Sequence, residues 1–302
     1  SPTQPLRLEG ERLLLSAAKV GGHVNKVGNR PRRLLVLGTA ALVALGLSGC
    51  GSDAKSEGAG GEKPLVVGME LAYPPFETKD EAGEPYGVSV DFMEDFAAAY
   101  DYDLVIDNIS FDGLIPSLQS GKVDAVMSSM TITEERQTSV DFSDPYAEAQ
   151  LAILANSNSG ITSIEDLNAP GMKVAVKTGS TGDVFATKNL PEAEIVRLAD
   201  ESACVTEVVQ GKADGFLYDQ LTIYRNQARN PEVTDAVFVP FQEVEYWGIA
   251  VAKGHDELRE QLNQFIADYA EDGGFARLTE KHLSEEKQAF DDLGFTWFFN
   301  VS

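Results

Sequence analysis

The segment Gln119-Ser120-Gly121-Lys122-Val123-Asp124-Ala125-Val126-Met127 has the pattern of a helix that ends at glycine and is followed at once by a strand, which is typical of an α/β fold. A similar segment occurs further along the chain, Gln210-Gly211-Lys212-Ala213-Asp214-Gly215-Phe216-Leu217. This internal similarity predicts two structural units of the same kind.

Outward from these segments, short apolar runs alternate with stretches of helical period, which is the pattern of βαβ units. The first unit contains predicted strands at 65–69, 104–109 and 123–127 and predicted helices at 88–100 and 114–120. The pattern begins again after Pro170, with predicted strands at 173–177, 194–198 and 215–218 and predicted helices at 182–189, 202–210 and 220–229. We therefore expect two mostly parallel sheets.

Two further apolar segments, 149–155 and 247–252, lie where the chain would leave the first unit and later return to it. We expect them to form paired connecting strands, so that the final helices belong to the first lobe. The predicted organisation is an α/β fold with a first lobe at 64–149 plus 247–302 and a second lobe at 150–246.

The charge of the chain excludes one class of partner. Its 302 residues include 24 Lys and Arg against 48 Asp and Glu, a formal net charge of -24. Such a surface repels a phosphate backbone, so we expect no nucleic-acid binding. His23, His255 and His282 show no ligand spacing, so no metal site is expected, and no cofactor is predicted. We expect a monomer.

The first fifty residues differ from the rest in being basic. Arg30, Arg32 and Arg33 precede an apolar run at 34–46, which is shorter than the roughly 20 residues that a spanning helix needs. This arrangement predicts an export signal.

The apolar run ends in Leu47-Ser48-Gly49-Cys50, which resembles the lipobox of bacterial lipoproteins, where the cysteine is diacylated and becomes the mature N-terminus. The alternative is that Cys50 is an ordinary thiol. We predict a leader and signal peptide at 1–49, lipidation of Cys50, and a flexible Gly- and Ser-rich tether at 50–63. The other cysteine, Cys204, is predicted to be a small core residue.

Candidate binding residues follow the ends of the predicted strands, where ligands bind in open α/β sheets. They are Glu70 and Tyr73 after the first strand, Ser128, Ser129 and Thr131 after 123–127, Lys177 and Thr181 after 173–176, and Asp219 after 215–218. Their chemistry suits a zwitterion.

Arg136 stands out within this set. Thr133 is a plausible helix N-cap, which would put the cation in the first turn, where the helix dipole disfavours it unless an anion compensates. A ligand carboxylate could be that anion. The alternative is a surface ion pair with a neighbouring acid, Glu135, Asp141 or Asp144.

Three other candidates also have an ordinary structural interpretation. The small-residue turn at 177–182 could present amides and hydroxyls to an anion, or be a plain turn. Asp219 could receive an ammonium group, or cap the following helix, and both roles could coexist. Tyr73 and Phe111 could enclose an aliphatic side chain, or belong to the core.

Three motifs together resemble the amino-acid-binding family 3 of bacterial extracellular solute-binding proteins. They are Gly68-Met69-Glu70-Leu71-Ala72-Tyr73-Pro74-Pro75-Phe76-Glu77, the segment from Gly113 to Asp124, and Thr131-Ile132-Thr133-Glu134-Glu135-Arg136 through Asp141-Phe142-Ser143-Asp144-Pro145-Tyr146. The resemblance extends from about 65 to about 283. Gly248-Ile249-Ala250-Val251 resembles the family's second hinge strand.

The resemblance implies a type II periplasmic-binding-protein fold, a Venus flytrap whose two lobes are joined by two hinge strands. It implies the substrate-binding lipoprotein of an ABC-type amino-acid importer, which closes on one amino acid, performs no chemistry and docks on a membrane permease. The expected location is extracytoplasmic, with a lipid anchor to the cell membrane, in the periplasm or at the outer face of the cytoplasmic membrane.

The resemblance also implies roles for the candidate residues. Arg136, with Thr131 and Thr181, would bind the ligand carboxylate, and Asp219 with the Ser129 backbone would bind the ammonium group. Ser128 would lie beside the pocket, and Lys177 would lie in the small-residue turn at 177–182. Tyr73 and Phe111 would form the aromatic walls of the pocket.

Glu70 would then contact the ligand side chain and determine which side chains can bind. Because Arg136 and Asp219 balance the zwitterion, Glu70 needs a partner of its own, which favours arginine, lysine, histidine or glutamine, with cystine also open. Many family members that bind basic amino acids have the shorter Asp here, so this Glu leaves the specificity open.

Two alternatives come from other functional classes. The same fold is used by periplasmic cyclohexadienyl dehydratases, for which Glu70 or Asp219 would have to act as the general acid. The chain could also be the ligand-binding sensor domain of a receptor. The lipobox and tether favour capture beside a membrane instead.

Overall fold

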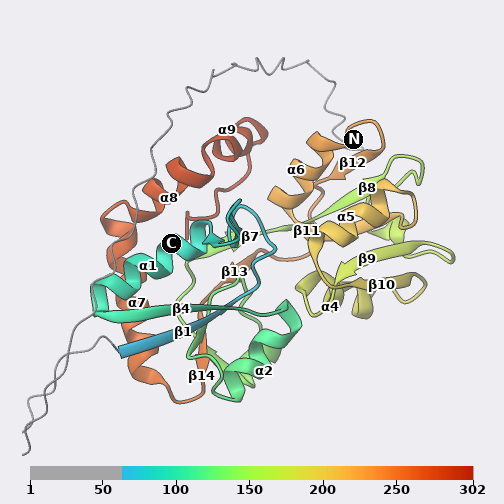
Figure 1. Cartoon of the computed structure of the whole chain (residues 1–302). Helices are drawn as coiled ribbons and strands as arrows, with labels where there is room; N and C mark the ends of the chain where they lie inside the picture. Colours follow the sequence, from blue (N-terminus) through green and yellow to red (C-terminus); the bar gives the residue numbers. More distant parts are fainter. Residues whose placement is uncertain (1–62, 302) are drawn as a thin grey trace, which may run out of the picture. The chain divides into compact units, whose positions relative to one another are not determined.

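The computed structural model describes residues 63–301 (Figure 1). The predicted leader, the lipidation site at Cys50 and nearly all of the predicted tether lie outside the described residues. Among the residues that the structure describes, no helix is both long and apolar enough to cross a bilayer.

The first sheet has five strands in the order β4-β1-β5-β14-β6. Their bounds are β4 Tyr102–Asn108, β1 Lys63–Met69, β5 Ala125–Val126, β14 Ala250–Ala252 and β6 Val140–Phe142. β4, β1 and β5 are parallel, and β14 is antiparallel to both of its neighbours. Figure 1 shows the blue β1 and the orange β14, which are far apart in the sequence, in this one sheet.

The second sheet repeats this arrangement in the order β10-β9-β11-β8-β12. Its strands are β10 Glu194–Leu198, β9 Lys173–Lys177, β11 Gly215–Asp219, β8 Leu151–Asn156 and β12 Thr234–Val237. β10, β9 and β11 are parallel, whereas β8 is antiparallel to β11 and to β12. Each sheet is thus parallel except for one strand, β14 or β8, which agrees with the expectation of two mostly parallel sheets.

Six of the described helices belong with the first sheet: α1 Val88–Tyr100, α2 Leu114–Gln119, α3 Glu134–Gln137, α7 Asp256–Glu271, α8 Gly274–His282 and α9 Ser284–Leu293. Three belong with the second sheet: α4 Thr181–Asn189, α5 Glu201–Val209 and α6 Gln220–Arg229. Short 3₁₀ turns cover Phe111–Gly113 and Glu165–Leu167, and a small hairpin joins β2 Thr78–Lys79 to β3 Pro85–Tyr86. The predicted helices and strands of both units are all present, with bounds within about two residues.

A third, two-stranded sheet joins the regions of the two larger ones. β7 Ala147–Ala149 pairs antiparallel with β13 Glu245–Trp247. The predicted paired segments, 149–155 and 247–252, are wrong in extent, because most of their residues form β8 and β14 inside the large sheets. A continuous apolar run is typical of a strand that is buried on both faces, as β8 and β14 are. The short crossing strands β7 and β13 each contain a glutamate, so they lack such a run.

Four of the helix N-termini are capped by a polar side chain that accepts a hydrogen bond from the first turn. Thr133 caps α3, Ser180 caps α4, Asp200 caps α5 and Asp219 caps α6. The predicted caps at Thr133 and Asp219 are confirmed. These caps fix where the loops after the strands end and the helices begin.

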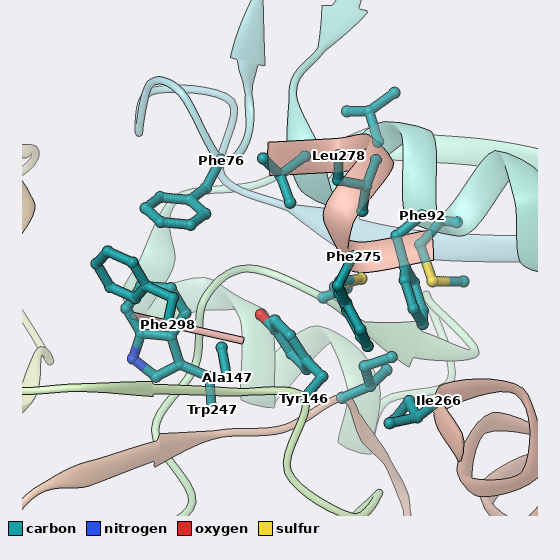
Figure 2. Close-up of a cluster of buried hydrophobic side chains, with 14 of the residues drawn as sticks. Phe76, Phe92, Tyr146, Ala147, Trp247, Ile266, Phe275, Leu278 and Phe298 are labelled. Carbon is teal, nitrogen blue, oxygen red and sulfur yellow. The ribbon is translucent and has the colours of Figure 1, made fainter. Parts of the chain in front are cut away.

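An aromatic cluster packs the end of the described chain against its beginning (Figure 2). The Phe76 ring centroid lies 5.0 Å from that of Trp247 and 5.1 Å from that of Phe298. Such contacts bury large apolar surface and bring the crossing strand β13 beside the first loop of the chain. Cys204 is fully buried in the core of the second sheet, as predicted.

Candidate functional site

A small cavity lies where residues of both large sheets meet, beside the crossing strands. Its volume is about 30 Å³, which is room for about one or two water molecules. It is lined by Tyr73, Phe111, Ser129, Thr131, Arg136, Leu151, Ser180, Thr181, Tyr218, Asp219, Glu245 and Trp247. Seven of the ten predicted binding residues are among them, and Glu70, Ser128 and Lys177 lie behind this lining.

Glu70 and Lys177 form an ion pair that joins the two sheets. Glu70 follows β1 and Lys177 ends β9, and the two residues are 5% and 1% exposed. The Lys177 ammonium also donates to the Tyr218 hydroxyl at 3.1 Å and lies 4.7 Å from the centre of the Phe111 ring. Burial raises the pKa of Glu70, and the charge of Lys177 opposes this shift.

This pair corrects one step of the sequence argument. Glu70 was expected to need its partner from the ligand, but Lys177 already supplies the cation. The backbone N–H of Glu70 donates to the Ser128 hydroxyl at 3.0 Å, which places Ser128 behind Glu70. Glu70 and Lys177 are 107 positions apart, so no local sequence pattern could have predicted their contact.

Asp219 has partners for both carboxylate oxygens. One oxygen accepts from the N–H groups of Leu221 and Thr222 at 2.9 and 3.1 Å, as an N-cap does. The other accepts from the Tyr73 hydroxyl at 2.6 Å and the Thr222 hydroxyl at 2.8 Å. Burial raises the pKa of Asp219, and these hydrogen bonds oppose the shift. A ligand ammonium would have to replace one of these donors, because a carboxylate has about four acceptor positions.

Arg136 points into the site. Its Nη1 donates to the carbonyl of Thr131 at 2.7 Å, and its Nη2 donates across to the carbonyl of Gly179 at 3.0 Å. The alternative of a surface ion pair with Glu135, Asp141 or Asp144 is not formed among the described residues, and Asp141 pairs instead with Lys253 at 2.7 Å. Burial lowers the pKa of the Arg136 guanidinium, opposed by the nearby charges of Glu245 and Glu135.

The turn at 177–182 depends on two glycines. Gly179 has a φ of +77°, a conformation that other residues adopt only with strain. At Gly182 a Cβ atom would lie 2.6 Å from the Leu217 carbonyl oxygen, so α4 can approach β11 closely only without a side chain there. Thr181 is thereby held at the start of α4, with its hydroxyl at the cavity.

Glu245 is a buried acid of the site that the sequence analysis missed. Its Oε2 accepts from the hydroxyls of Thr131 and Thr181, both at 2.9 Å, and burial raises its pKa. It lies just before the apolar run at 247–252, in a strand too short for a periodic signal. The other lining residues that were missed are Leu151, Ser180, Tyr218 and Trp247. Tyr218 and Trp247 lie at the ends of predicted strands. An aromatic side chain at such an end could have marked them as candidate binding residues.

A buried polar network supports Ser129 from behind. Ser129 has a φ of 48° and its hydroxyl donates to Glu77 Oε2 at 3.2 Å, while the Ser89 hydroxyl donates to the same oxygen at 2.6 Å. Burial raises the pKa of Glu77 to about 8, so it is protonated at neutral pH. Within residues 63–301, Glu77 Oε1 and the Tyr146 hydroxyl have no hydrogen-bond partner.

No group of three or more His, Cys, Asp or Glu side chains among residues 63–301 is arranged to hold a metal ion. The lining instead offers a guanidinium, carboxylates and hydroxyls. Such groups bind the two charged ends of a small zwitterion by hydrogen bonds and charge.

Removing one partner of the buried ion pair is expected to be costly. Lys177→Met leaves Glu70 as an uncompensated buried charge, so the free energy of unfolding should fall by about 3–5 kcal/mol. The double variant Glu70→Gln with Lys177→Met should recover much of this loss. Urea denaturation measures both, with Lys122→Met in the exposed Lys122–Asp107 pair as the control, expected to change stability by less than about 1 kcal/mol. Equal effects of Lys177→Met and Lys122→Met would contradict the assignment.

The protonated Glu77 predicts a pH dependence of stability. Its pKa is raised from 4.5 to about 8 in the folded state, so its contribution is complete below pH 4.5 and is lost as the pH rises towards 8. Glu77→Gln, which resembles the protonated acid, should flatten the fall in Tm between pH 5 and pH 8. Burial also raises the pKa of Glu201 to about 8, so Glu201 should still cause some decrease in Tm over this pH range in the Glu77→Gln variant. The exposed Glu243→Gln is the control, and a Glu77→Gln profile identical to it would refute the prediction.

Comparison with known proteins adds independent information on this geometry. The family model described as bacterial extracellular solute-binding proteins, family 3, matches residues 65–285. A probable histidine-binding protein of Neisseria gonorrhoeae is 32% identical over 252 residues, covering 82% of this chain and 94% of the relative.

Two solved structures share the fold. An ancestral arginine-binding protein bound to glutamine has a TM-score of 0.67 and 37% identity, over 73% of this chain and 97% of that one. The ancestral amino acid-binding protein AncCDT-1, a precursor of cyclohexadienyl dehydratase, has a TM-score of 0.66 and 36% identity, over 72% of this chain and 94% of that one. The predicted two-lobe α/β fold is thus confirmed, and the chain belongs to the bacterial extracellular solute-binding proteins of family 3.

Proposed function

We propose that this chain captures a polar amino acid between its two lobes and delivers it to an ABC permease in the membrane, with glutamine as the favoured ligand. The observation that carries the proposal is the convergence of Arg136, Thr181 and Asp219 on one cavity. The Glu70–Lys177 pair lies next to this lining, where the Lys177 ammonium contacts Phe111 and Tyr218. The histidine-binding relative and the arginine-binding structure with glutamine support this ligand class.

The two charged ends of an amino acid find complementary groups at this cavity. Arg136 and the hydroxyls of Thr131 and Thr181 would bind the carboxylate. Asp219, by exchanging the Tyr73 hydroxyl for an ammonium, would bind the other end. The cavity of about 30 Å³ is smaller than an amino acid, so the ligand must exchange with these internal contacts when it enters.

The Glu70–Lys177 pair favours a neutral amide side chain. A ligand cation next to Glu70 would also lie next to the Lys177 ammonium, and like charges at short range repel. A side-chain amide has both a donor for Glu70 and an acceptor for Lys177, so it leaves neither charge unpaired. Glutamine meets this requirement better than arginine, lysine or histidine.

Binding without chemistry remains part of the proposal. AncCDT-1 is a precursor of a dehydratase, so the fold also permits catalysis. The two acids considered for proton donation are engaged, however, since Asp219 accepts four hydrogen bonds and Glu70 is paired with Lys177. We propose a binding protein and not an enzyme.

The location and the lobe bounds are also proposals. We propose that Cys50 is lipidated and that the tether at 50–63 holds the protein outside the cell membrane. We further propose lobes at 64–149 plus 247–302 and at 150–246, which agrees with the strand membership of the two large sheets.

Ligand specificity is tested by calorimetry, guided by a thermal-shift screen of the amino acids. Glutamine should bind tighter than arginine, and ligand at 100 times its Kd should stabilise the protein by about 2.7 kcal/mol. Arg136→Ala should abolish binding of both. Lys177→Met should reverse the preference towards arginine, because Glu70 is then free to pair with the ligand cation. Tight binding of arginine or lysine with glutamine inert, in the unmodified protein, would overturn the role given to Lys177.

The anchor is tested separately. Cys50→Ser should release the protein from the membrane fraction without changing ligand affinity, because Cys50 precedes the described fold. Cys204→Ala is the matched control, since this buried thiol belongs to the core, and it should leave the protein in the membrane fraction. Retention of the Cys50→Ser variant in the membrane fraction would disprove lipidation at this residue.

A further inference from the structure

The carboxylate of Glu245 lies where two predicted ligand-binding hydroxyls converge. Its Oε2 accepts from Thr131 and from Thr181, each at 2.9 Å, and its Oε1 accepts from the Gln242 amide at 2.6 Å. The residue is only 9% exposed. A buried acid with three donors is held in one place by the fold.

These contacts tie together parts of both large sheets. Thr131 follows β5 of the first sheet, and its backbone pairs with Trp247 in an isolated bridge. Thr181 begins α4, beside the second sheet. Glu245 is the first residue of the crossing strand β13, so its one carboxylate connects both sides to the connecting strand.

The side chain of Glu245 ends in a carboxylate, which is the same group that the α-carboxylate end of an amino-acid ligand would bring to this subsite. Arg136 lines the same cavity and holds the Thr131 carbonyl at 2.7 Å. A guanidinium with two hydroxyls forms a binding site for one carboxylate. In the structure, Glu245 already occupies the two hydroxyls.

Simultaneous occupation by a ligand is unfavourable for two reasons. Each threonine hydroxyl has one proton and can donate it to only one acceptor at a time. Two carboxylates placed side by side in a buried site also repel each other. Ligand carboxylate and Glu245 therefore compete for the same donors.

The position of Glu245 also separates two cavities. Glu245, Arg136 and Thr181 line both the inner cavity of about 30 Å³ and an outer cavity of about 490 Å³. The outer cavity is bordered further by Val184 and Lys188. The two cavities therefore share these three side chains.

We propose that Glu245 is an internal competitor that sets the affinity of the site: it occupies Thr131 and Thr181 in the ligand-free protein and is displaced by the ligand's carboxylate. The proposal rests on the function proposed above. It assigns to Glu245 a role in setting affinity that is separate from the selection of the ligand side chain by Glu70 and Lys177.

Calorimetry with L-glutamine and L-arginine as probes tests the competition. Glu245→Ala should bind each probe that the unmodified protein binds about tenfold more tightly, which corresponds to about 1.4 kcal/mol. Glu245→Gln should give a smaller gain, because the amide oxygen can still accept from the hydroxyls but the charge is gone. This second variant also covers the case in which Glu245→Ala does not fold. The control is Glu243→Gln, an exposed acid two residues away, which should leave the affinity unchanged.

A second measurement separates this inference from the proposed function. In the ligand-free protein, amide hydrogen exchange of the segments that contain Thr131 and Thr181 should be faster in Glu245→Ala than in Glu243→Gln. Unchanged or weaker binding by both Glu245 variants would overturn the competition, as would unchanged exchange. If no amino acid binds to any variant, the proposed function fails, while the exchange result still tests the contact itself.

Discussion

The ion pair between Glu70 and Lys177 is the interaction on which the arrangement of the site depends. Both groups are almost completely buried, and a charge in such a place is stable only with a partner of opposite sign. Because Glu70 follows β1 and Lys177 ends β9, the pair forms only when the ends of these strands face each other. The surrounding rings of Phe111 and Tyr218 complete the environment of the ammonium.

The other charged groups at the cavity are held by hydrogen bonds to neutral groups. Asp219 is held by Tyr73 and by the first turn of α6, Arg136 by two carbonyl groups, and Glu245 by two hydroxyls and an amide. Several of these contacts join residues of different sheets. In this conformation the carboxylates at the cavity already accept internal hydrogen bonds, so a ligand that takes their donors must replace these bonds with better ones.

This exchange explains why a polar ligand suits the site. An apolar molecule would separate the internal partners and leave buried charges without compensation, which is costly. A zwitterion carries a carboxylate and an ammonium that can replace the contacts of Glu245 and Tyr73. The protonated Glu77, which also accepts from the Ser89 hydroxyl, gives Ser129 a neutral support, so no further charge has to be compensated there.

Most helices and strands and most of the candidate residues could be predicted from local patterns in the sequence. Hydrophobic period and helix caps are local properties, so helix 88–100, strand 173–177 and the caps at Thr133 and Asp219 could be predicted within a residue or two. The rule that ligands bind beyond strand ends led to Tyr73, Ser129 and Asp219 at the cavity.

Which of these groups are partners became known only from the folded structure. Glu70 and Lys177 are 107 positions apart, and Thr131 and Glu245 are 114 apart, so no local pattern indicates their contacts. The antiparallel strands β8 and β14 and the short pair β7–β13 likewise depend on where the chain crosses between the sheets. Period and capping act over a few residues, whereas the compensation of a buried charge depends on how distant segments meet, and that is fixed only when the chain has folded.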